Sequence, residues 1–114
     1  MKICSFEEII SWQKSKALTI DVYRIFRICK DYSFKDQIQR ASLSINNNIA
    51  EGFERCSKKE FKHFLYIAKG SCGEVRSMLY IANELGYLKE QKFKELHDKT
   101  IEISKLLLGL IRTL

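Results

Sequence analysis

The sequence predicts an all-α fold over residues 1–114, an antiparallel four-helix bundle with up-down-up-down connections. The chain has no proline and only five glycines, so few residues force a break in a long helix. A serine followed three residues later by an acidic residue precedes three apolar segments, a common pattern at helix starts. Within these segments apolar residues recur every three or four positions, as on one face of a helix.

The first helix is predicted from about Phe6 to Cys29, with Ser5 and Glu8 at its start. The part from Ile20 to Cys29 is rich in β-branched and aromatic residues and could form a strand on local preference alone. A helix is favoured because no turn interrupts the segment and no partner strand is found elsewhere.

The apolar residues of this helix form two stripes, which indicates packing against two neighbours. One neighbour could be another protomer, so self-association is one interpretation; the alternative is a helix that is central in the monomer. The stripes are Ile10, Ala17 and Ile20, and Leu18, Val22, Ile25 and Cys29.

Three further helices follow, joined by short connections that favour antiparallel neighbours. Their predicted ranges are about Phe34 to Arg55, Lys58 to Leu85 and Glu90 to Arg112. Ser33 stands before the second helix of the chain and Ser57 before the third. Gly86 is expected to take the left-handed conformation that ends the helix from Lys58 to Leu85. The three consecutive asparagines from Asn46 are poor helix formers, yet the apolar period continues across them.

The spacing of apolar residues in these helices predicts the packed core. In the second helix the core residues are Phe34, Ile38, Ala41, Ile45 and Ile49. In the third they are Phe61, Leu65, Ala68, Cys72, Val75, Leu79 and Ala82, and in the fourth Phe93, Leu96, Thr100, Ile103, Leu107, Leu110 and Leu114.

Composition indicates a cytoplasmic protein with an affinity for acidic partners. The net charge is +6 and the sequence pI is about 9.2, which favours nucleic acid as a partner without requiring one. No signal peptide is expected, since Glu7 and Glu8 interrupt the first apolar stretch. No membrane span is expected either, because the longest strongly apolar patch, Leu106 to Ile111, is too short to cross a bilayer. The four cysteines form no CxxC pair, so we expect reduced thiols rather than a zinc site.

No convergent catalytic site is predicted, and we expect neither enzymatic activity nor a metal or other cofactor. His63 and His97 have no ligand partner at helical spacing, and Gly70 and Gly73 lie in a helical pattern rather than in a phosphate-binding loop. A carboxylate-and-histidine pattern for two metal ions is also missing.

A row of basic residues near one face of the third helix is the strongest candidate binding site. It comprises Arg55, Lys58, Lys59, Lys62, Lys69 and Arg76, with Tyr66 among them. Lys58 and Lys59 lie in the first turn, where the helix dipole disfavours cations and a phosphate would favour them. The alternative is a solvated lysine face partly balanced by Glu60.

A second, polar group lies on the second and third helices beside the apolar seam. Its members are Arg40, Asn48, Glu51, Ser71 and Glu74. We interpret it as a hydrogen-bonded network that sets the register of two helices, with a ligand pocket as the alternative.

The chain resembles the bacterial four-helix-bundle family of 23S rRNA intervening-sequence proteins along nearly its whole length. The resemblance is strongest from Gln37 to Phe61, in the run Asn-Ile-Ala-Glu-Gly followed by Arg. One departure is that Cys29 and Lys30 stand where the family usually has a proline before the second helix. The residues that carry the resemblance are Phe6, Trp12, Gln13, Lys14, Tyr23, Arg40, Ala41, Ser44, Asn48, Ile49, Ala50, Glu51, Gly52, Arg55, Ala68, Gly70, Ser71, Glu74, Leu85, Gly86 and Tyr87.

The resemblance implies a homo-oligomer, commonly a pentamer. It also implies similarity to the accessory protein of diversity-generating retroelements, a basic pentamer that contacts nucleic acid and a reverse transcriptase. From this we expect contact with RNA in preference to DNA. A scaffold that binds a protein partner without touching nucleic acid is the alternative.

Overall fold

The computed structural model describes residues 2–114, and its four long helices confirm the all-α prediction. The helices are α1 (Ile10–Ile25), α2 (Tyr32–Glu54), α3 (Lys58–Glu84) and α4 (Glu90–Arg112), with short 3-10 turns η1 (Phe6–Glu8) and η2 (Phe26–Ile28) on either side of α1. No strand occurs among residues 2–114, so the helical interpretation of the segment from Ile20 is confirmed through Ile25.

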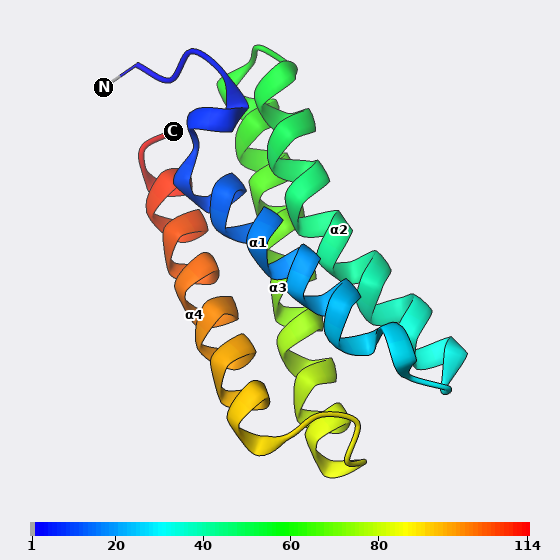
Figure 1. The fold of residues 1–114 in the computed structure, drawn as a ribbon. Coiled ribbons are helices and arrows are strands. Elements are labelled where there is room, and N and C mark those ends of the chain that lie inside the picture. The colour runs from blue at the N-terminus through cyan, green and yellow to red at the C-terminus, as the bar shows by residue number, and fades with distance from the viewer. Residues whose placement is uncertain (1) are drawn as a thin grey trace.

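Successive helices run antiparallel and form an elongated bundle (Figure 1). Each of α1 and α3 packs between α2 and α4. The α2–α3 turn and both chain ends lie at one end of the bundle, and the other two connections lie at the opposite end (Figure 1). The bundle measures 43 × 22 × 19 Å, and each helix has exposed residues along its length. None of the helices in residues 2–114 combines the length and the apolar character needed to cross a lipid bilayer.

The predicted starts of α3 and α4 match the structure, whereas α2 begins at Tyr32, two residues before the predicted start, and α1 begins at Ile10, four residues after it. Ser57 caps α3, because its hydroxyl accepts a hydrogen bond of 3.3 Å from the Glu60 amide. In α2 the cap is Asp31, which accepts from the Phe34 amide, so the assignment of Ser33 is wrong. Ser5 precedes η1 without capping it, and extended backbone at Ile9 separates that turn from α1.

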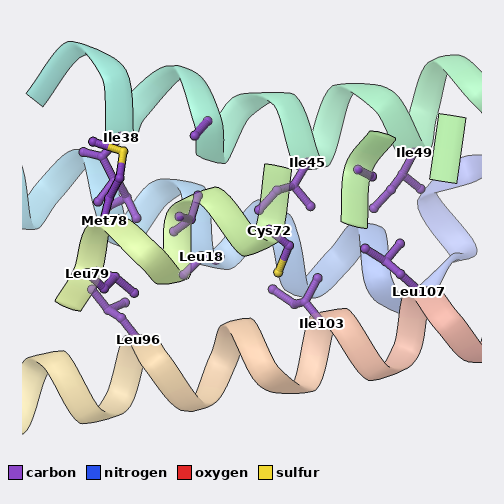
Figure 2. Close-up of a cluster of buried hydrophobic side chains, with 14 of the residues drawn as sticks. Leu18, Ile38, Ile45, Ile49, Cys72, Met78, Leu79, Leu96, Ile103 and Leu107 are labelled. Carbon is purple, nitrogen blue, oxygen red and sulfur yellow. The ribbon is translucent and has the colours of Figure 1, made fainter. Parts of the chain in front are cut away.

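The core is formed by the predicted apolar faces of all four helices. Figure 2 shows Ile38, Ile45 and Ile49 of α2 directed across the interior towards Leu96, Ile103 and Leu107 of α4. All seven predicted core residues of α3 are buried. At the end of α4 the prediction missed Ile111, which is 2% exposed, while the predicted Leu110 and Leu114 are partly buried and pack against the core. A strict alternation of three and four drifts around a helix with 3.6 residues per turn, so the buried stripe passes to Ile111.

The two apolar stripes of α1 have different environments. Leu18 and Val22 are fully buried. In the other stripe Ile10 is 50% exposed, Ile20 is 40% exposed, and Ala17 is exposed as well. The interpretation that α1 is simply central in the monomer is therefore wrong for this stripe, which lies on the surface of a single chain.

Side-chain contacts hold the two connections at the far end of the bundle together. The Tyr87 hydroxyl donates a 2.6 Å hydrogen bond to Asp31, and its ring lies 5.4 Å from that of Phe34. Gly86 has φ of +75°, as expected for the left-handed residue after α3. At the opposite end Cys56 takes φ of +58° in the α2–α3 turn, a conformation that costs a non-glycine residue free energy.

Candidate nucleic-acid interface

Five of the six predicted basic residues lie along one flank of α3, and together they are called the α3 cationic face. They are Lys58, Lys59, Lys62, Lys69 and Arg76. Lys62, Lys69 and Arg76 are seven residues apart, which places them on nearly the same side of the helix at intervals of about 10.5 Å. Both Lys69 and Arg76 act electrostatically on the Cys72 thiol, which contacts α4, so the face borders α4.

The charge of this face is not compensated by neighbouring carboxylates. Among residues 2–114, none of the five cations has a carboxylate oxygen within 4.0 Å, whereas Lys14, Lys92 and Lys99 do. Lys58, Lys59 and Lys62 are exposed, while Lys69 and Arg76 are partly buried, as expected for long side chains that lie along the helix and keep their charge in water. The face therefore presents a positive potential that an anionic partner would neutralise.

Arg55 has different surroundings. Its guanidinium lies 2.9 Å from Glu51 and 3.6 Å from Glu60, and 5.0 Å above the ring of Phe64. The hydrogen bond with Glu51 raises the pKa of Arg55 above its ordinary value. Arg55 thus belongs to the contact between α2 and α3, and it is less free than the other five cations to bind a phosphate.

The predicted polar group is divided among several contacts. Asn48 donates hydrogen bonds of 2.7 and 3.0 Å to the carbonyl and hydroxyl of Ser44, whose hydroxyl lies 2.8 Å from that of Ser71. This three-residue junction joins α2 to α3 at one level. The other members lie apart: Glu74 pairs with Gln37, Glu51 with Arg55, and the exposed Arg40 with Asp36.

A polar link between α1 and α2 was missed in the sequence. Asn46 donates hydrogen bonds to the Trp12 carbonyl at 3.1 Å and to the Ser15 hydroxyl at 2.9 Å. One turn away Thr19 donates to the Ser42 carbonyl at 3.1 Å. The unusual asparagine run was the available signal: Asn46 bonds to α1, while Asn47 is exposed.

Ionisable groups with shifted pKa values are dispersed over the bundle. Besides Arg55, the hydrogen bond from Tyr87 holds the pKa of Asp31 below its usual range and correspondingly raises that of Tyr87. Burial raises the pKa of Cys72 to about 11, and its thiol donates to the Thr100 carbonyl in the core. Within residues 2–114 no three His, Cys, Asp or Glu side chains are grouped closely enough to hold a metal ion.

The comparison with known families bears on this bundle and its motifs. The family model described as 23S rRNA-intervening sequence protein matches residues 7–109, most of the chain. The chain belongs to this family. Among solved structures, it is similar to a crystal structure of a protein of unknown function from the S23 ribosomal protein family of Bacteroides thetaiotaomicron. The two share 22% sequence identity with a TM-score of 0.84, over 90% of this chain and 96% of the other. No curated protein matches this chain significantly.

The structure gives physical roles to the motif that carries the resemblance to the intervening-sequence protein family. Asn48 belongs to the junction with Ser71, and Glu51 holds Arg55 over Phe64. Gly52 lies at a close approach of α2 and α3, because a Cβ there would be 2.6 Å from the Phe64 Cβ. In this chain the family motif therefore forms the seam between α2 and α3, next to the start of the α3 cationic face.

Proposed function

We propose that this member of the intervening-sequence protein family is a non-enzymatic cytoplasmic bundle that associates with nucleic acid, RNA in preference to DNA, through the α3 cationic face. The uncompensated charge of that face is the observation that supports the proposal. The row from Lys58 to Arg76 is about 27 Å long, enough to follow several successive phosphates of a backbone. The family description, which refers to 23S rRNA, is the reason for choosing RNA as the first ligand.

The salt dependence of binding tests this proposal quantitatively. If all five cations neutralise a phosphate of a duplex, the slope of log K against log salt should be about −4.5. Between about 50 and 200 mM salt the affinity should then fall on the order of 500-fold. Fluorescence anisotropy with a labelled, structured RNA measures this slope, and a flat response would contradict the proposal.

A charge-matched pair of variants locates the binding surface. The test variant changes Lys62, Lys69 and Arg76 to Gln; the control changes the exposed α1-side residues Lys16, Arg24 and Lys30 to Gln, which removes the same charge. The test variant should lose much of its affinity for RNA, and its slope of log K against log salt should be about −1.8. The affinity and the slope of the control variant should change little. Equal loss in both variants would mean that net charge rather than the α3 face attracts RNA.

The exposed stripe of α1 supports a second proposal, a homo-oligomeric scaffold that holds a protein partner. Ile10 and Ile20 are about half exposed, and Ile10 borders a groove towards α4 that is also lined by Ile3, Leu106 and Leu110. Burying such residues against another copy would remove apolar area from water. The pentamer implied by the resemblance is the stoichiometry to test.

Light scattering after size exclusion distinguishes the oligomer from a single chain. We expect a mass several times 13.4 kDa for the wild type and a smaller mass after Ile10→Gln and Ile20→Gln. A strict monomer at high concentration would contradict self-association and would leave the nucleic-acid proposal to the binding assays.

A further inference from the structure

Two tyrosines, with a glycine between them at the same spacing, lie beside the cationic row of α3. Tyr66, Gly73 and Tyr80 are seven residues apart, as are the neighbouring cations, and each row stays on nearly one side of the helix. Tyr66 and Tyr80 are therefore separated by about 21 Å along the helix axis, with the cations alongside them. Both rings lie on the surface, where each tyrosine is 52% exposed.

The Tyr80 ring is held in place from beneath. It lies 5.2 Å from the ring of Phe93 and 5.3 Å from that of His97, and its hydroxyl is 2.9 Å from the Nε2 atom of His97. A side chain fixed in this way loses little conformational freedom when another ring stacks on its open face. Tyr80 is a preorganised platform at the edge between α3 and α4.

Two glycines, Gly70 and Gly73, lie on the helix surface between the two tyrosines. A Cβ added at Gly73, or at Gly70 beside it, would meet no atom within 4 Å, so packing inside the chain does not require glycine at either position. Glycine within a helix is less favourable than alanine, and here it leaves the backbone open to a close approach from outside. Between the two rings this side of α3 therefore carries only small residues, Gly70, Gly73 and the exposed Ser77.

We propose that the α3 face binds unpaired nucleotides of a single strand, with bases stacked on Tyr66 and Tyr80 and phosphates neutralised by Lys62, Lys69 and Arg76. This inference rests on the proposed nucleic-acid function and adds the class of ligand. A duplex keeps its base faces inside its own stack, so exposed tyrosine rings gain nothing from it. Proteins that bind single strands combine a cationic track with aromatic rings, because every base offers a face for stacking.

The test compares four labelled ligands of matched sequence by anisotropy: single-stranded RNA, single-stranded DNA and the duplex of each. Tyr66→Ala should weaken binding of both single strands by roughly five- to a hundredfold. It should leave the weaker duplex binding unchanged, and Tyr66→Trp should restore the affinity. Tyr32→Ala is the matched control, because Tyr32 is 70% exposed and is the first residue of α2 rather than part of α3. Because Tyr80 packs against Phe93, its variant Tyr80→Leu is used only after thermal unfolding shows a folded protein.

The outcomes separate this inference from the proposed function. If the Lys62, Lys69 and Arg76 variant loses RNA but Tyr66→Ala binds all four ligands like the wild type, stacking is wrong and the cationic interface stands. If duplexes bind as tightly as single strands, the ligand class is wrong. A change of oligomeric mass in Tyr66→Ala would assign the row to an interface between copies and overturn the inference. If the triple variant still binds RNA normally, both proposals fail. A single-strand preference shared by RNA and DNA would show that stacking and charge suffice without the 2′-hydroxyl.

Discussion

Replacing Gly52 by alanine tests the close approach of α2 and α3. The new Cβ would lie 2.6 Å from the Phe64 Cβ, 3.2 Å from the Phe61 Cδ1 atom and 3.4 Å from the Phe61 carbonyl oxygen. Carbon atoms normally approach to about 3.5–4.0 Å, so the two helices would have to separate by about 1 Å. Rotation of a side chain cannot relieve the clash, because the Phe64 Cβ is bonded directly to the α3 backbone.

The magnitude follows from two opposing effects. Alanine is favoured over glycine within a helix by about 1 kcal/mol. Overpacking typically costs about 1–3 kcal/mol, and the rigid contact with Phe64 places Gly52→Ala at the upper end of this range. We therefore expect a net loss of about 2 kcal/mol in the free energy of unfolding. Gly70→Ala is the matched control: a Cβ there meets no atom within 4 Å, so it should gain about 1 kcal/mol.

Urea unfolding followed by circular dichroism measures both variants. In thermal unfolding the two should move in opposite directions, by roughly 8 °C downward for Gly52→Ala and roughly 4 °C upward for Gly70→Ala. If Gly52→Ala proved as stable as Gly70→Ala, the steric account of this motif glycine would be refuted.

Three further predictions concern polar contacts and thiols. Asn46→Ala should destabilise the fold by about 1–3 kcal/mol, because it removes the hydrogen bonds from Asn46 to α1. Asn47 is exposed, so Asn47→Ala should be neutral or slightly stabilising. Equal urea midpoints for the two variants would contradict the polar link between α1 and α2. Because the pKa of Asp31 is lowered, its contribution to the free energy of unfolding is present above about pH 3.9 and is lost as pH falls through its folded pKa. Because the pKa of Tyr87 is raised, the contribution of Tyr87 to the free energy of unfolding is lost as pH rises above about 10. Tyr87→Phe should abolish the alkaline loss and reduce the acid one, which urea titrations across pH would show; an unchanged alkaline profile would argue against the pair. With its pKa near 11, Cys72 should resist a thiol reagent until the protein unfolds while the exposed thiols react at once, and rapid modification of all four cysteines would contradict its burial.

Local signals predicted individual helix ends with unequal success. At α3 the serine box was sufficient, because Ser57 and Glu60 lie within one turn and the bond between them depends only on local backbone. At α2 the local pattern pointed to Ser33, whereas the cap is Asp31, two residues earlier. The structure selects Asp31, which also accepts from Tyr87 across the bundle, a contact between residues 56 positions apart that local pattern does not contain.

The candidate interface was predicted only in part, because local spacing does not contain contacts between distant residues. Heptad spacing alone placed Lys62, Lys69 and Arg76 on one flank of α3. Spacing could not show that Arg55 turns towards Phe64 and two carboxylates, nor that Tyr80 rests on residues of α4. Those contacts depend on which helices become neighbours.

The sequence by itself determined the number of helices, their approximate extents and the residues of the core, because apolar spacing and helix propensity act within a few turns of chain. Tertiary structure decided which of the two α1 stripes is buried, which polar side chains find partners, and which cations remain free. These depend on helices brought together from distant parts of the chain, where a few ångströms decide whether a charge meets a carboxylate or stays in water.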